Sequence, residues 1–167
     1  MNAIFERTSV RRFEDREVEP EMIDAILRAG MAAPSGGNQR PWEFYVVRDA
    51  ETINKLAGSS PYAVCAKDAG TVIVPCYRTS GLMYPELVTM DMSACVENML
   101  IEITALGLGG VWLSIAPYED RMRNVDMILG IGDKHRSFAL IPVGYPAQSR
   151  PAADRFEESR VHGLCKR

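Results

Sequence analysis

An apolar run between Met92 and Leu106 predicts the helix around which the rest of the chain is organised. Apolar side chains there cover nearly the whole circumference at 100° per residue. Five polar residues interrupt them: Ser93, Glu97, Asn98, Glu102 and Thr104. A helix of this composition must be buried on most sides. Asp91 is suited to cap its start and Gly107 to follow its end. Because one small domain cannot readily cover such a helix, we expect a partner subunit.

The rest of the chain alternates between helical and strand patterns. Helices are predicted at 3–5, 20–31, 50–57 and 119–129, and strands at 43–48, 70–77, 111–116 and 138–143. The segments 33–42 and 78–85 are predicted loops, and 146–167 is polar without a clear period. This alternation predicts an α/β or α+β sandwich with one mixed sheet.

Composition narrows the class of protein. The 167 residues predict one domain, and a net charge of −3 argues against bulk nucleic-acid binding. No run of about 18 apolar residues predicts a membrane span, and the charged N-terminus is unlike a signal peptide. The four cysteines, at positions 65, 76, 95 and 165, form no metal-ligand spacing with the two histidines. We therefore expect a cytoplasmic protein with reduced thiols and no metal.

Arg7, Ser9 and Arg11 are the first candidates for ligand binding. In an extended segment, residues two apart point to the same side, which would align two guanidinium groups and a hydroxyl. Arginine forks bind phosphate oxygens and serine adds a further donor. The alternative is a solvated surface run, paired with the neighbouring acidic residues.

Two glycine-containing segments could present backbone amides to a ligand. The loop from Pro34 to Trp42 is one of them, and Ser35 and Asn38 add side-chain donors there; it could equally be a plain connection. The second, Gly107–Ser114, is not a dinucleotide fingerprint, because it follows a helix and lacks the third glycine. No nucleophile with a neighbouring base stands out, which favours chemistry carried by a cofactor.

Taken together, several segments resemble the FMN-dependent nitroreductase family over nearly the full length of the chain. They are RTSVRRF at 7–13, APSGGNQRPWEFYVV at 33–47, the helix and strand at 91–112, IPVGYP at 141–146 and RFEESRVH at 155–162. The resemblance implies an α+β fold, in which helices flank a mixed, mainly antiparallel central sheet. It also implies a single domain over 1–167, an intertwined homodimer, and a C-terminal arm at 146–167 that packs on the partner.

The resemblance also assigns roles to the basic residues. Arg7 and Ser9 correspond to the residues that hold the FMN phosphate. Arg11 corresponds to the basic residue that reaches the ribityl chain and the pyrimidine edge. A late arginine returns to the phosphate, for which Arg160 fits best and Arg155 second.

Two further groups of residues correspond to contacts with the flavin ring. One is the loop that reaches the ring from the other subunit: Pro34, Ser35, Gly36 and Asn38. The other consists of backbone amides that face the flavin N5 and carbonyl edge, which we place at Ser114 and Ile115. No catalytic side chain is expected, because FMN carries the chemistry.

The implied activity is electron transfer from NADH or NADPH through FMN to a nitroaromatic, quinone or related small-molecule acceptor, in a ping-pong cycle. Two other classes stay open. One is a specialised flavin enzyme of the same fold, such as a reductive dehalogenase or a flavin-consuming enzyme. The other is a non-catalytic flavin-binding protein.

Overall fold

A computed structural model describes residues 2–148 and 151–163. Its helices are α1 (Ala3–Glu6), α2 (Pro20–Met31), α3 (Ala50–Ala57), α4 (Val88–Ala105) and α5 (Glu119–Leu129), with short 3-10 turns η1 (Gly36–Asn38), η2 (Val64–Asp68), η3 (Pro85–Leu87) and η4 (Glu158–Arg160). Its strands are β1 (Trp42–Val47), β2 (Thr71–Arg78), β3 (Gly109–Gly110), β4 (Leu113–Ser114), β5 (His135–Ser137) and β6 (Ala139–Gly144). None of the described helices is both long and apolar enough to cross a lipid bilayer.

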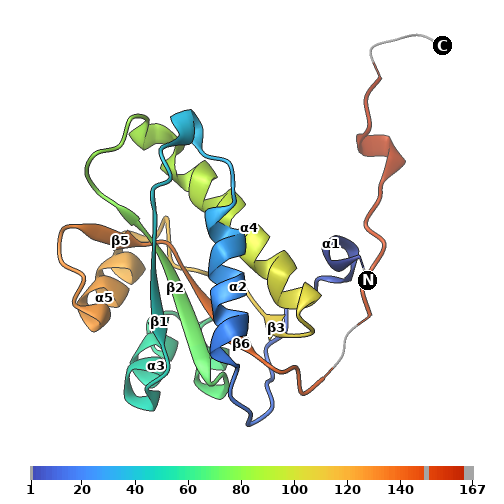
Figure 1. Ribbon diagram of the computed structural model, residues 1–167, viewed down its shortest axis with the longest axis horizontal. Coiled ribbons are helices and arrows are strands. Elements are labelled where there is room, and N and C mark those ends of the chain that lie inside the picture. Colours follow the sequence, from blue (N-terminus) through green and yellow to red (C-terminus); the bar gives the residue numbers. More distant parts are fainter. Residues whose placement is uncertain (1, 149–150, 164–167) are drawn as a thin grey trace.

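The strands form one open sheet between two layers of helices (Figure 1). The order is β1-β2-β6-β3, with β4 also paired to β6 and β5 to β2, and every ladder is antiparallel. The only parallel contact among the described residues is an isolated bridge between Ser9 and Gly110. The predicted fold class, helices flanking a mainly antiparallel sheet, is confirmed.

Each face of the sheet has its own apolar core. Ile73 and Ile141, which pair across β2 and β6, pack toward α2 and α4. Val72 and Val74 point to the opposite face, where they pack with α3 and α5. This division follows from the alternation of side chains along a strand. Because both faces of β2 and β6 are covered, both strands read as continuous apolar runs.

The central helix differs from its prediction at one end. α4 begins at Val88, so Asp91 is not its N-cap but lies inside the helix and is buried. The other end is as predicted: Gly107 has a left-handed φ of 75°. The amides of Gly107 and Leu108 donate to the carbonyls of Thr104 and Ile103, which closes the helix with a Schellman motif.

The burial of α4 is incomplete. Eight of its residues, Val88, Asp91, Met92, Cys95, Val96, Met99, Leu100 and Ile103, are buried. A stripe at helical spacing remains exposed or half-buried, consisting of Met90, Ala94, Glu97, Ile101 and Ala105. We call these five residues the open stripe.

The other elements follow the prediction with two corrections. The expected strand 111–116 is only partly present: β4 occupies 113–114 and pairs with β6, whereas β3 pairs with β6 before a break at 111–112. β5 was not predicted, because its sequence His-Arg-Ser carries no apolar pattern.

The described cysteines, Cys65, Cys76 and Cys95, are free thiols, and burial raises the pKa of Cys95 to about 12. Cys165 lies outside the described residues.

The C-terminal segment leaves the body of the molecule after β6. Residues 151–163 run past α1 and extend outward without joining the sheet (Figure 1). They are exposed throughout, including the large apolar side chains Phe156 and Val161. Within the described residues, this segment therefore has no core of its own.

α2 and α4 approach each other closely at Gly30, where a larger side chain would not fit. A Cβ atom built there would lie 2.9 Å from Met99 Cγ and 3.1 Å from Cys95 Sγ. We expect Gly30→Val to lower the free energy of unfolding by about 1–3 kcal/mol, because it overpacks this interface. Denaturant unfolding measures the effect, with Arg28→Val, an exposed position on the same helix, as the control. Equal stability of the two variants would show that the helices can separate without cost.

Candidate functional site

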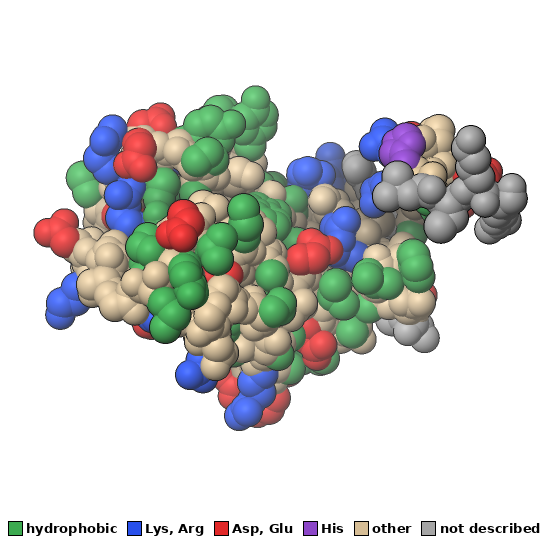
Figure 2. Space-filling model, turned by 90° about the horizontal axis from the view of Figure 1, so that it is seen from above, with side chains coloured by type: hydrophobic (Ala, Val, Ile, Leu, Met, Phe, Trp, Pro, Cys, Tyr) green, Lys and Arg blue, Asp and Glu red, His purple; other side chains and the backbone are tan. Residues whose placement is uncertain are grey.

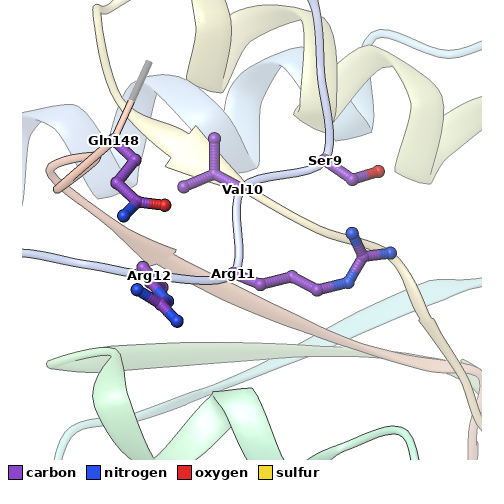
Figure 3. Close-up of a pocket in the computed structure, with 5 residues that line it drawn as sticks. All are labelled: Ser9, Val10, Arg11, Arg12 and Gln148. Carbon is purple, nitrogen blue, oxygen red and sulfur yellow. The ribbon is translucent and has the colours of Figure 1, made fainter. Parts of the chain in front are cut away.

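The segment 7–13 adds an edge to the sheet beside β3. The amide of Val10 donates to the carbonyl of Gly110 at 3.0 Å, and Ser9 and Gly110 form the parallel bridge. Gly109 has to be small here, because a Cβ on it would lie 2.7 Å from Val10 Cβ. The extended backbone sends Ser9 and Arg11 to one side and Val10 to the other (Figure 3). The alternation predicted from the sequence is therefore present for Ser9 and Arg11.

Two cavities meet at Arg11. The smaller, about 130 Å³, is lined by Ser9, Val10, Arg11, Arg12 and Gln148 (Figure 3). The larger, about 490 Å³, is lined by Arg11, Tyr62, Trp112, Leu113, Ser114, Tyr118 and Arg121. Ser114, predicted to present a backbone amide, thus shares a cavity with Arg11, while the side chain of Ile115 is fully buried in the core. We call the two spaces the small and the large cavity.

Arg7 lies on the same segment but makes a different contact. Its Nε lies 3.4 Å from Glu97 Oε1, and its side chain is 21% exposed. Glu97 belongs to the open stripe of α4. The pair is weak at this distance and exposure, so an incoming anion could draw the guanidinium away at small cost.

The loop 34–38 lies at the other end of α4: in Figure 1 the blue turn just before β1 lies beside the start of α4, whereas α1 lies near its end. Gly37 and Asn38 both adopt left-handed backbone, with φ of 54° and 55°. Ser35 Oγ accepts a hydrogen bond from the Arg40 amide at 2.9 Å. Pro34 and Asn38 are exposed.

A buried carboxylate fixes this loop. Asp91 accepts hydrogen bonds from the Gly36 amide at 2.8 Å and from Gln39 Nε2 at 2.7 Å. Gln39 is buried as well, and its side-chain amide also pairs with the backbone carbonyl and amide of Tyr84, both at 3.0 Å. The sequence pattern indicated a tertiary role for neither residue, since Asp91 resembled a helix cap. A charged residue amid the buried positions of α4 was the available signal.

The two arginines of the C-terminal segment do not line the small or the large cavity. Arg155 borders a separate cavity with residues of α1, including Ile4 and Phe5. Arg160 is exposed and pairs with Glu157 at 2.7 Å. A single chain therefore brings together Ser9, Arg11 and Ser114. It places the loop 34–38 and Arg160 elsewhere.

The end of the molecule that carries this loop is unusually apolar. Met31, Met83, Tyr84 and Met90 are all exposed there. The space-filling view from above shows hydrophobic side chains on this face, with the C-terminal segment projecting away from the body (Figure 2). Such a surface is typical of an interaction or ligand-binding face.

Comparison with known proteins points to one family. The family model described as "Nitroreductase family" matches residues 4–80 and 66–145. A protein of Methanothermobacter thermautotrophicus, provisionally named NADH dehydrogenase/NAD(P)H nitroreductase, is 38% identical over 97% of this chain and 85% of its own. A crystal structure from Clostridium acetobutylicum, provisionally named NADH oxidase, has a TM-score of 0.94 and 39% identity, covering 98% of this chain and 99% of the other. A provisionally named nitroreductase from Desulfovibrio desulfuricans, solved in complex with FMN, has a TM-score of 0.83 and 28% identity, with coverage of 99% and 96%.

The Asp91 contacts give a testable prediction. Asp91→Asn keeps the shape but turns one acceptor into a donor that faces Gln39 Nε2, so one buried hydrogen bond is lost. We expect a loss of about 1–3 kcal/mol in unfolding free energy, together with faster hydrogen exchange at the Gly36 amide. Asp24→Asn, at an exposed position on α2, is the matched control. Unchanged exchange at Gly36 in the Asp91 variant would contradict the assigned role.

Proposed function

Because the chain belongs to the Nitroreductase family, we propose that this oxidoreductase binds FMN at Arg11 and passes electrons from NADH or NADPH to a small-molecule acceptor. The observation that carries the proposal is the meeting of the two cavities at Arg11. One is small and polar and the other is larger with aromatic walls, which matches a cofactor with a phosphate tail and a flat ring.

The small cavity suits the phosphate end of FMN. Its lining includes the Ser9 hydroxyl and the Arg12 guanidinium, with Gln148 beside Arg12, while the Arg11 guanidinium points away from Arg12 and Gln148 (Figure 3). These are the donors that bind phosphate oxygens. Arg7 lies on the same segment, and its guanidinium would leave the Glu97 carboxylate and bind the phosphate instead. The large cavity would hold the ring between Trp112 and Ser114, with Arg11 near the edge that becomes negative on reduction.

We propose that a second copy of the chain completes the site. α4 spans about 27 Å from its 18 residues, and the loop 34–38 lies at the end opposite the small cavity. One ligand of FMN size cannot contact both ends within one chain. Two chains packed through their open stripes would bring the loop of one subunit to the cavities of the other.

The C-terminal arm fits the same arrangement. In this proposal, residues 151–163 lie on the partner and bury Phe156 and Val161. Arg160, or alternatively Arg155, then reaches the phosphate across the interface. Burying two large apolar side chains would offset part of the ordering entropy of the arm.

In this mechanism the protein binds and orients the reactants. Bound FMN supplies the two-electron chemistry between the nicotinamide and the acceptor. Arg11 would stabilise negative charge near the ring, and Ser114 and Ile115 would offer backbone groups along its edge. Ser35 and Asn38 of the second chain would hold the ring from the other side. No protein nucleophile is required, because bound FMN would carry the electrons, and we propose nitroaromatics and quinones as acceptors.

The direct test is spectroscopic. We expect the purified protein to bind one FMN per chain and to release FMN, rather than FAD, on denaturation. NADH or NADPH should bleach the flavin absorbance under anaerobic conditions, and a nitroaromatic or quinone should restore it. A protein that stays colourless with added FMN overturns the proposal. Flavin that binds but resists bleaching by both nucleotides indicates a passive binder, and reoxidation by halogenated phenols alone indicates a reductive dehalogenase.

A further inference from the structure

The large cavity carries more positive charge than the flavin ring alone requires. Arg11 and Arg121 both line it, and no acidic residue does. Three of its seven lining residues are aromatic: Tyr62, Trp112 and Tyr118. A cavity with two cations and flat apolar walls is complementary to planar aromatic anions.

Arg121 is held in one orientation. It lies in the first turn of α5, and its Nη1 donates to the carbonyl of Ser114 at 3.2 Å. Its guanidinium carbon lies 4.1 Å from the centroid of the Tyr118 ring and 5.8 Å from that of Tyr62. One face of the guanidinium is therefore occupied by Tyr118 and one N–H by Ser114. The other N–H groups, which lie in the plane of the guanidinium, can still bind a carboxylate in bidentate fashion.

The nearby acidic residues do not neutralise Arg121. Glu119, on the same turn, pairs with Arg136 at 2.8 Å. Asp126, about two turns beyond Glu119 on α5, lies 3.1 Å from Arg136 Nε. Within residues 2–148 and 151–163, no carboxylate lies within 4.0 Å of the Arg121 guanidinium nitrogens. The Arg121 charge is thus available to a ligand in the large cavity.

We propose that Arg121 binds the negative group of the electron acceptor, and that the preferred acceptors are planar aromatic compounds with a carboxylate. This inference rests on the proposed function, in which Arg11 is engaged by the flavin. Ser114 then links the two sites, since its backbone borders the ring and its carbonyl orients Arg121. Tyr118 and Tyr62 supply the aromatic surface beside the carboxylate-binding group. An acceptor held in this way would lie over the flavin with its charge toward α5.

The test compares two acceptors of nearly equal shape, 4-nitrobenzoate and the neutral 4-nitrobenzamide, with the FMN-loaded enzyme and NADH. We expect Arg121→Gln to lower the ratio of kcat/KM for the acid to that for the amide by about ten- to hundredfold, the contribution of a charge-assisted hydrogen bond. Arg121→Lys should give an intermediate ratio, because lysine keeps the charge but loses the fork. Arg123→Gln, on the same helix but outside the large cavity, is the matched control and should keep the wild-type ratio.

A second measurement does not depend on turnover. Benzoate binding to the oxidised holoenzyme, followed through the flavin absorbance, should weaken in Arg121→Gln by a similar factor. A ratio and a benzoate affinity equal to those of wild type would overturn the inference. Equal loss with both acceptors would also overturn it, because Arg121 would then act on the flavin itself. In both cases, bleaching of the flavin by NADH would still support the proposed function. A wild-type protein that binds no flavin would contradict the proposed function and the Arg121 inference together.

Discussion

The length and burial of α4 constrain the rest of this structure. The helix is packed against α2 on one side and the sheet on another, with eight buried residues along it. Its first turns hold the loop 36–39 through Asp91. Its last turn leads through Gly107 into β3, which in turn holds the segment with Ser9 and Arg11. The helix thus holds the two groups of residues that we propose as ligand-binding at its opposite ends, about 27 Å apart.

A second chain that closes this gap would also account for three surfaces that one chain leaves exposed. The open stripe of α4, the apolar end around Met83 and Met90, and the C-terminal arm with Phe156 all lack cover in one chain. A two-chain site would bury all three while bringing the loop to the cavities. Burial of apolar area and completion of the flavin site would then be the same event, so ligand binding and association would stabilise each other.

Local patterns were sufficient to predict most of the fold. α2, α3 and α5 have amphipathic sequences with clear ends, and their predicted bounds agree with the structure. The start of α4 was wrong, because Asp91 has the chemistry of a cap but is used for a tertiary contact. The strand predicted at 111–116 is shorter than expected, with only 113–114 paired to β6. Val111, Leu113 and Ile115 are apolar because they pack in a core, and an apolar pattern does not show how many of them also pair in the sheet.

The sequence predicted the candidate site only for residues that are close together in the chain. Ser9 and Arg11 are two residues apart, so their shared direction follows from backbone geometry. Tyr62 and Arg121 come from segments far apart that only the fold brings together, and Gln39 meets Asp91 across 52 positions. The roles of the loop residues and of Arg160 depend on a second chain, and they stay predictions.

Subunit exchange between two inactive variants tests the shared site most directly. One carries Arg7→Ala and Arg11→Ala, and the other carries Ser35→Ala and Asn38→Ala. A mixed dimer would have one intact site and one doubly altered site. Random exchange of equal amounts should restore roughly one quarter of wild-type NAD(P)H oxidase activity, since half the dimers are mixed and each has one working site. No recovery after confirmed exchange, or full activity of a monomer at high dilution, would contradict a site built from two chains.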